Sequence, residues 1–318
     1  MNLPSDSPLI GAVDIGGTKI AVGLIDSEGK IRARQEFPTY PDGGFDRAIR
    51  RISDSLRKLS EGVKSQILGI GIGATGPVDP LLGAFGKINF MPAWEGRNPV
   101  EMLSRDFGVQ VGLENDADAA ALGEAHWGAA RGCNRLAYVT VGTGIGVALI
   151  IDGQIYRGLD GAHPEIGHHT IDPAGPLCSC GSRGCWEAFA AGPAMVNWLQ
   201  AQAPDRFPAS ADLTAKRICE IAAQGDAWAR RAVEQHSRYL GIGLANVIAF
   251  FVPDTIVLGG SVMNSLPLFI DGIRKEILDR CSLVPAANVE LKAASLGKDA
   301  ALAGAASVWY HRFARNGE

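Results

Sequence analysis

The sequence predicts an α/β fold made of two related lobes with a cleft between them. Short apolar runs typical of strands alternate with segments of helical periodicity, which favours mixed sheets covered by helices. A glycine-rich hairpin also occurs twice, because a shift of 126 residues aligns Gly16 with Gly142 and Ile25 with Ile151. A chain of 318 residues is long enough for two hydrophobic cores. We therefore expect a duplicated unit whose copies each open with a hairpin.

The first copy begins at about residue 9. Residues 9–13 and 20–25 are apolar runs on either side of the first glycine loop, so they should form a β-hairpin. The elements expected after it are a helix at 45–59, strands at 67–73 and 109–113, and an alanine-rich helix at 117–130.

The second copy opens with the hairpin at 136–141 and 147–151. The elements expected after it are helices at 193–203, 213–224 and 227–250, a strand at 255–258 that ends in Gly259-Gly260, and helices at 266–280 and 299–313. We expect the last helix to pack back on the first lobe. The smaller N-terminal lobe is therefore predicted as residues 1–117 plus 299–318, and the larger C-terminal lobe as residues 118–298.

The composition is that of a soluble globular enzyme, with 47% hydrophobic and 20% charged residues. No apolar run reaches the ~18 residues of a membrane span. A net charge of −4 offers no basic surface for nucleic acid, and the early first strand leaves no room for an N-terminal DNA-reading domain. Residues 1–7 lack the basic and apolar regions of a secretory leader. We therefore expect a cytoplasmic protein that binds neither membrane nor nucleic acid.

A histidine pair and three cysteines form the most informative cluster. His168 and His169 precede Cys178, Cys180 and Cys185, and one imidazole with three thiolates completes a tetrahedral zinc site. No position remains for water, so the predicted zinc is structural. Either histidine can be the fourth ligand.

A disulfide cluster and buried free thiols are the alternatives to zinc. Disulfide scaffolds are short, cysteine-dense and secreted, which this chain is not. The two thiols of a Cys-x-Cys cannot easily bond each other, although both can ligate one ion. We expect the other cysteines, Cys133, Cys219 and Cys281, to be buried thiols.

The tip of the first hairpin carries groups that suit phosphate. Gly16 and Gly17 let backbone N–H groups approach phosphate oxygens, and Thr18 adds a hydroxyl and Lys19 an ammonium. Asp14 can hold Mg²⁺ through water. The spacing is neither that of a Walker A loop nor that of a dinucleotide fingerprint. An ordinary turn is the alternative.

The second glycine loop, Gly142–Gly146, makes an ordinary turn less attractive. It repeats the first loop and offers Thr143 and Gly144 to a phosphate. One hairpin for each end of a triphosphate is the economical interpretation.

The segment Glu114-Asn115-Asp116 lies where a strand is expected to give way to a helix. Asp116 there is either a helix cap or a general base for phosphoryl transfer to an alcohol. The phosphate loops favour the base, and Asn115 beside it can bind a neighbouring hydroxyl.

Glu165, His168 and Glu187 flank the cysteines and suit the vicinal hydroxyls of a sugar. A glycosidase also uses two carboxylates, but it has no need of two phosphate loops. The remaining histidines show no partner pattern, and we expect structural roles for His126, His163, His236 and His311.

Taken together, these motifs resemble the ROK family of sugar kinases and sugar-responsive repressors, within the actin-like (ribonuclease H-like) ATPases. The resemblance runs from about Leu9 to Ala306 and includes the Cys-x-Cys-Gly-x-x-Gly-Cys-x-Glu pattern of glucokinase-like members. Position 118 departs from many relatives, because it is Asp where they have Asn.

The resemblance implies an ATP- and Mg²⁺-dependent kinase that phosphorylates the 6-hydroxyl of glucose, with Asp116 as the catalytic base. It implies zinc on His168, Cys178, Cys180 and Cys185, with the second ring nitrogen of His168 on a sugar hydroxyl. It also implies a homodimer or homotetramer. The implied sugar ligands are Gly76, Asn89, Asn115, Asp116, Glu165, His168 and Glu187, and the implied nucleotide ligands are Asp14, Gly16, Gly17, Thr18, Lys19, Thr143, Gly144, Gly259 and Gly260.

Two rival functions remain at this stage. N-Acetylmannosamine is a rival substrate, because the residues that would bind it in relatives are the same. A non-catalytic sugar sensor is the more distant rival, and the intact Asp116 and both phosphate loops argue against it. One sequence does not specify the preferred hexose or the phosphoryl donor.

Overall fold

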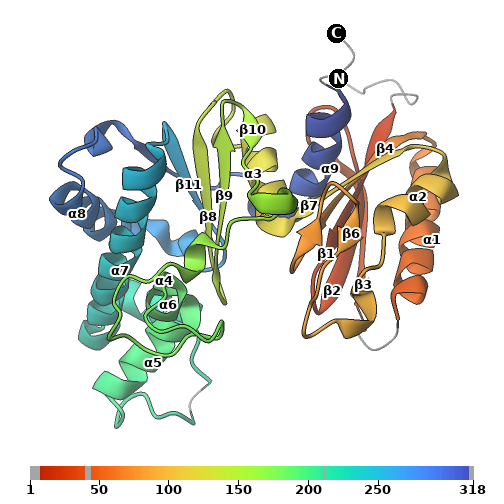
Figure 1. The fold of residues 1–318 in the computed structure, drawn as a ribbon. Coiled ribbons are helices and arrows are strands. Elements are labelled where there is room, and N and C mark those ends of the chain that lie inside the picture. The colour runs from red at the N-terminus through yellow and green to blue at the C-terminus, as the bar shows by residue number, and fades with distance from the viewer. Residues whose placement is uncertain (1–7, 40–43, 211, 315–318) are drawn as a thin grey trace.

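Two five-stranded sheets lie side by side in the computed structural model, which describes residues 8–39, 44–210 and 212–314 (Figure 1). The opening residues 1–7, on which the leader prediction depended, lie outside the described residues. So do residues 315–318, at the end of the predicted first lobe.

The first sheet has the strand order β3-β2-β1-β4-β7, and its central strand is antiparallel to β2 and parallel to β4. Its strands are β1 (Leu9–Ile15), β2 (Lys19–Ile25), β3 (Ile31–Pro38), β4 (Ile67–Ala74) and β7 (Gln110–Asn115). A two-stranded ribbon of β5 (Val78–Asp79) and β6 (Ala84–Phe85) lies between β4 and β7 in the chain.

The second sheet repeats this topology in the order β10-β9-β8-β11-β12. Its strands are β8 (Leu136–Val141), β9 (Ile145–Ile151), β10 (Gln154–Ile155), β11 (Thr255–Gly259) and β12 (Glu290–Ala293). In both sheets a hairpin opens the unit and a parallel strand joins its first strand from the other side. The predicted duplication is confirmed.

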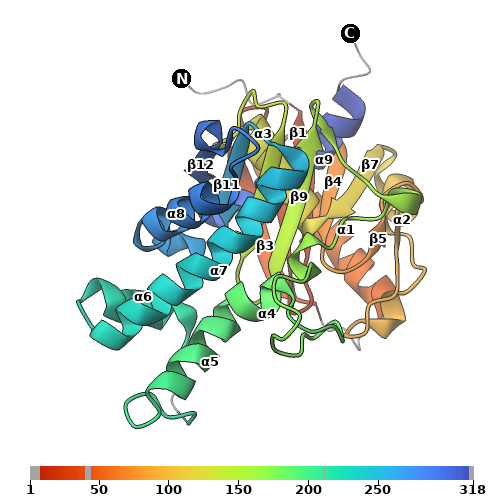
Figure 2. The same cartoon turned by 60° about the vertical axis from the view of Figure 1, so that its left-hand side comes forward.

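Helices cover both sheets (Figures 1 and 2). Those of the first part of the chain are α1 (Phe45–Val63), α2 (Pro99–Phe107) and α3 (Asp116–His126). Those of the second part are α4 (Trp186–Ala190), α5 (Gly192–Gln202), α6 (Ala215–Ala223), α7 (Ala227–Phe251), α8 (Ile270–Arg280) and α9 (Ala300–Phe313).

Strand β1 shows how the first sheet buries both of its faces. Val13 and Ile15 belong to the core shared with α1, whereas Ile10 and Ala12 pack with residues of α9. This alternation follows from the two-residue period of a strand. Because both faces are covered, nearly the whole strand is apolar.

Helices α3 and α9 fill the middle of the molecule between the two sheets (Figure 1). Helix α9 covers the inward face of the first sheet, and α3 packs on β8 and β9 of the second. The two helices meet at Gly123 and Gly304, where a Cβ on Gly304 would lie 2.7 Å from the carbonyl oxygen of Ala119. Only glycine allows so close an approach of two backbones.

A buried carboxylate ties three parts of the chain together. Glu114, at the end of β7, is fully buried and pairs with Arg157, which follows β10. Arg312 of α9 lies 3.4 Å from the same carboxylate oxygen. The cluster therefore links the first sheet, the second unit and the last helix.

The sequence-based assignment missed the short elements β5, β6, β10 and α4, and also β3, α2 and β12. β3 is an edge strand whose residues alternate between half-buried and exposed, so it has no apolar run. β12 is also an edge strand and has no buried residue. Helix α2 spans only nine residues. It does carry a local start signal, because the side chain of Asn98 accepts the Glu101 backbone N–H and Pro99 is the first helical residue. Within the described residues, no helix is long and apolar enough to cross a membrane.

Candidate active site

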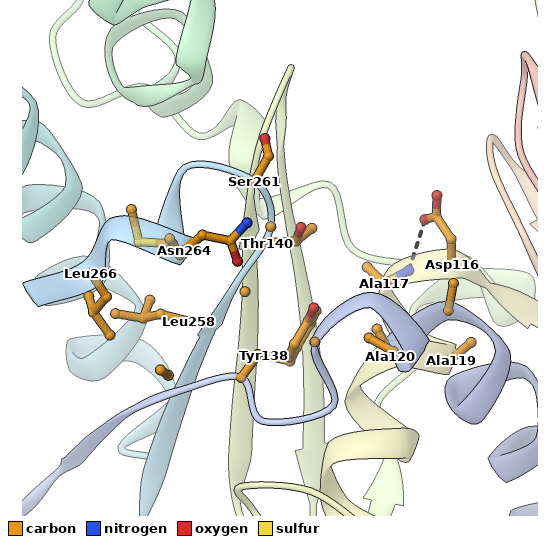
Figure 3. Close-up of a pocket in the computed structure, with 18 of the residues that line it drawn as sticks. Asp116, Ala117, Ala119, Ala120, Tyr138, Thr140, Leu258, Ser261, Asn264 and Leu266 are labelled. Carbon is orange, nitrogen blue, oxygen red and sulfur yellow. Dashed lines mark hydrogen bonds between the residues drawn. The ribbon is translucent and has the colours of Figure 1, made fainter. Parts of the chain in front are cut away.

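A cavity of about 700 Å³ opens between the two units (Figure 3). Its wall contains Asp14 from β1 and Asp116 from the start of α3, and Gly259 and Gly260 from the end of β11 lie on its opposite side. Four predicted site residues from distant parts of the chain are thus brought together. Sequence reasoning missed Tyr138, Ser261 and Asn264, which also line the cavity.

Asp116 begins α3 directly after β7, and its carboxylate opens on the cavity. The Ala117 backbone N–H donates to Oδ1 of Asp116 at 2.8 Å (Figure 3). The same N–H donates to Oδ1 of Asn115, also at 2.8 Å. Asn115 is the helix cap, so the capping role first weighed for Asp116 belongs to its neighbour. The surrounding protein reduces the hydration of the Asp116 carboxylate, and this desolvation raises its pKa despite the Ala117 hydrogen bond.

Asp14 lies near the end of β1 and is half-buried. Burial, and then the charge of Asp116, raise the pKa of Asp14 to about 7. A divalent cation would stabilise the ionised form of Asp14, because its positive charge opposes the effects of burial and of Asp116. The Asp14 carboxylate therefore suits Mg²⁺ held through water.

Gly259 and Gly260 allow the backbone of the far wall to pack closely against β8. A Cβ on Gly259 would lie 2.4 Å from the Tyr138 hydroxyl, and one on Gly260 would lie 2.4 Å from the Val141 carbonyl oxygen. Gly260 also has φ +88°, a left-handed conformation that favours glycine. A side chain at either position would therefore collide with Tyr138 or with the Val141 backbone.

The other residues of the first phosphate loop do not line this cavity. Lys19 is exposed and pairs with Glu36 at 3.4 Å, and Thr18 is exposed. Gly17 lies under the ring of Phe90, where its Cβ would approach to 2.8 Å. Gly16 closes the hairpin through its N–H, which donates to the Lys19 carbonyl.

His168, Cys178, Cys180 and Cys185 bring their ligand atoms within 4.8 Å of one another. Sγ of Cys180 lies 3.6 Å from Sγ of Cys185, and Sγ of Cys178 lies 3.5 Å from Nδ1 of His168. Zn–S bonds of ~2.3 Å at tetrahedral angles place two sulfur atoms ~3.8 Å apart. The residues therefore fit a zinc ion.

His168 and His169 point in different directions. The Nε2 atom of His168 lies 4.0 Å from a carboxylate oxygen of Glu165, so its ring spans the cysteine cluster and that acidic group. His169 instead contacts the Ile166 carbonyl at 2.6 Å and the Asn246 side chain at 3.0 Å. His169 is thus used within the fold.

Glu187, at the end of the cysteine motif, contacts the second glycine hairpin. Its Oε2 accepts the Ile145 backbone N–H at 2.9 Å, and its Oε1 accepts the Ser179 hydroxyl at 3.5 Å. A Cβ on Gly144 would lie 2.4 Å from Oε2. The carboxylate thus lies directly against Gly144, and Thr143 beside it is exposed.

The remaining predicted sugar residues lie outside the 700 Å³ cavity. Asn89 and Glu165 are exposed, and Gly76 is half-buried with φ +81°, in contact range of Ile88. The structure therefore divides the predicted site into a cavity wall with both aspartates and a separate group around the cysteines.

His163, for which we expected a structural role, has a partner that the sequence did not indicate: its Nδ1 lies 3.0 Å from Oδ1 of Asp118. One side-chain prediction is wrong. Cys133 was expected to be buried, but it is half-buried, with its Sγ 3.4 Å from the Thr255 hydroxyl. Cys219 and Cys281 are buried as expected.

Known proteins of one family are similar to this chain in sequence and architecture. The ROK family profile matches residues 10–312. A glucokinase from Thermotoga maritima is 33% identical to this chain, and the match covers 94% of this chain and 96% of the glucokinase. A xylose repressor from Bacillus spizizenii is also 33% identical, and the match covers 95% of this chain and 77% of the repressor. The structure of a ROK family glucokinase from Streptomyces griseus, in complex with glucose and AMPPNP, is 34% identical with a TM-score of 0.78, covering 94% of this chain and 98% of that one.

The duplicated actin-like fold, with two aspartates and a glycine turn around one cavity, is that of an ATP-dependent sugar kinase. The chain belongs to the ROK family.

Proposed function

We propose that this kinase transfers the γ-phosphoryl group of ATP to the 6-hydroxyl of glucose, with Asp116 as the general base. The observation that carries the proposal is that Asp116 shares one cavity wall with Asp14, opposite the Gly259-Gly260 turn. That arrangement puts a proton acceptor next to a place suited to charged phosphates.

In the proposed reaction the sugar O6 forms a bond to the γ-phosphorus while the bond from that phosphorus to the β–γ bridging oxygen breaks. The O6 proton passes to the Asp116 carboxylate, and ADP leaves. The raised pKa of Asp116 suits this role, because a base accepts a proton more readily as its pKa approaches the working pH. The Ala117 N–H holds one carboxylate oxygen, which leaves the other to receive the proton.

Mg²⁺, when bound with ATP, would neutralise charge on the phosphoryl oxygens. Asp14 is the group we assign to it, through water. We assign the adenosine part of the nucleotide to the side of the cavity lined by Gly259 and Gly260. The glycine hairpins, Gly16 to Lys19 and Thr143 to Gly144, are proposed to reach the phosphates when the two lobes close on the substrates.

Glucose is proposed as the acceptor because several glucokinases stand among the similar proteins, including those from Thermotoga maritima at 33% identity and from Streptomyces griseus at 34%. We propose that Gly76, Asn89, Asn115, Glu165, His168 and Glu187 contact the sugar. His168 would bind zinc through Nδ1 and a sugar hydroxyl through Nε2, which faces Glu165. The proposed zinc is structural and fixes the segment that carries these groups.

The proposal extends to assembly and location. A homodimer or homotetramer is expected, and light scattering on the purified protein tests it. A cytoplasmic location follows from the need for ATP and for reduced zinc-binding thiols.

ADP release should be measured with glucose, mannose, fructose, N-acetylglucosamine and N-acetylmannosamine, with zinc quantified in the same sample. Turnover on glucose above the other sugars supports the proposal. Preference for N-acetylmannosamine would retain the mechanism and replace the substrate. Sugar binding without turnover on any of the five would show a sensor instead.

A further inference from the structure

A buried ion pair lies beside the proposed base and has no part in the mechanism above. Nδ1 of His163 is 3.0 Å from Oδ1 of Asp118, and the side chains are only 12% and 3% exposed. The motif resemblance offers no explanation for an acidic residue at position 118. The structure shows that its carboxylate has His163 as a partner. Such a pair is costly to bury, so the loss of one member leaves a strongly unfavourable charge.

The pair joins two segments of the proposed site. Asp118 lies in the first turn of α3, two residues after Asp116. His163 lies in the segment that follows β10, two residues before Glu165 and five before His168. The contact therefore fixes the segment of the proposed sugar ligands on the helix that presents the base.

The charged groups that raise the pKa of His163 are three carboxylates. Asp118 and Asp116 face it from α3, and Glu165 faces it from its own segment. Burial opposes the charged imidazole, but the contact with Asp118 and the neighbouring carboxylates outweigh burial and raise the pKa of His163.

The pKa of Asp116 is shifted in opposite directions by His163 and by the neighbouring carboxylates. The positive charge of His163 lowers the pKa of Asp116, and the negative charges of Asp118 and Glu165 raise it. Asp14 from β1 and Tyr138 from β8 also face Asp116. Asp118 without His163 would therefore be an unopposed negative charge next to the base.

We propose that Asp118 and His163 are a pair of positioning residues, which hold the Glu165–His168 segment against α3 and cancel each other's charge beside Asp116. Neither residue lines the cavity of the two aspartates, so they act through Asp116 and Glu165. The inference rests on the proposed kinase function and adds two residues to it.

The test compares H163N, D118N and the double variant D118N/H163N by the pH dependence of kcat/KM for the best sugar. H163N should move the acid limb to higher pH by about 0.5–1 unit, because Asp116 then holds its proton more tightly. Its KM for sugar should rise several-fold, since Glu165 is less well held. The double variant should return the acid limb towards that of the wild type, because the unopposed charge is gone.

A purely structural role predicts no such rescue. An acid limb of H163N that coincides with the wild type, or a double variant no closer to the wild type than H163N, would overturn the proposal. Thermal unfolding of each variant shows whether it is folded. His163→Gln is the second variant if H163N is not.

An NMR titration of the His163 imidazole in wild type and D118N tests the pair without any turnover. Loss of the Asp118 charge should lower the imidazole pKa by about one unit, and an unchanged pKa would refute the pair. A wild type inactive on every sugar would defeat the proposed function, but this titration would still decide the pair.

Discussion

The carboxylate of Glu187 accepts the backbone N–H of Ile145 at 2.9 Å, which joins the end of the cysteine motif to the second glycine hairpin. A change at the proposed zinc site can therefore reach the loop that we assign to phosphate. The hydrogen bond also explains why residue 144 is glycine, since a Cβ there would lie 2.4 Å from the same carboxylate.

Gly144→Ala is expected to displace Glu187 and the hairpin together. The KM for ATP should rise about tenfold or more, since a misplaced loop loses on the order of 1.4 kcal/mol of binding. Gly142→Ala is the matched comparison, because its Cβ would meet only the Ser261 hydroxyl at 3.5 Å. Steady-state kinetics of both variants should show the smaller loss for Gly142→Ala; equal losses would argue against the Glu187 contact as the cause.

Asp116→Asn should lower kcat by ~10²–10⁴-fold, the usual contribution of a positioned base, with little change in sugar affinity. The asparagine can still accept the Ala117 N–H but cannot take the proton. Single-turnover kinetics and sugar titration by calorimetry separate the two effects. Asp205→Asn, on an exposed loop, serves as the control, and near-normal turnover of Asp116→Asn would remove the base assignment.

Asp14→Asn should raise the Mg²⁺ concentration needed for half-maximal activity by about tenfold, because one carboxylate is lost beside the proposed cation. Wild-type Asp14, with a pKa of about 7, should also release part of a proton when Mg-ATP binds at pH 7. Binding calorimetry in two buffers of different ionisation enthalpy measures this release. An unaltered Mg²⁺ requirement, or equal proton release in the variant, would contradict the role.

Cys180→Ser should remove bound zinc and weaken sugar binding, because the loop that ends at Glu187 loses one of four ligands. Elemental analysis should find about one zinc per wild-type chain. Cys133→Ser is the matched control, since that thiol lies apart from the cluster and its hydrogen bond to Thr255 suits a hydroxyl. Full zinc content in Cys180→Ser would exclude the proposed site.

Acid should destabilise the protein through His236. Complete burial lowers the pKa of this imidazole to about 4, below the unfolded value of 6.5, so between these values the unfolded state binds more protons. Stability should fall as pH decreases from about 6.5 towards 4, by a few kcal/mol at most from this group. Urea unfolding at pH 7, 6 and 5 should show a smaller loss for His236→Gln; a parallel loss would assign the acid sensitivity to other groups.

The fold class was predictable because its signals are local. The two hairpins carry apolar strands around glycine turns, and both sheets repeat one strand order. The edge strands β3 and β12 were not predictable, since a strand with little buried surface has no apolar pattern.

The site was predictable where one short motif contains the relevant groups, as for Cys178, Cys180 and Cys185. The pairing of His163 with Asp118 was not, because forty-five positions separate the two residues and neither has a local pattern. The second acidic residue in the first turn of α3, Asp118 after Asp116, was the one available signal. A buried acid without a nearby basic residue in sequence needs a partner from elsewhere in the fold.

Helix α9 covers the first sheet but is synthesised long after it, so the core of the first sheet cannot be completed until α9 has been made. Ile10, Ala12 and Ala21 lie against Leu302 and Trp309, which are synthesised long after them. At ~5–20 residues per second, the inward face of the first sheet waits roughly 10–40 seconds for its cover. During synthesis the first sheet therefore exposes this apolar face until α9 has been made, and loss of α9 would harm the first sheet more than the second.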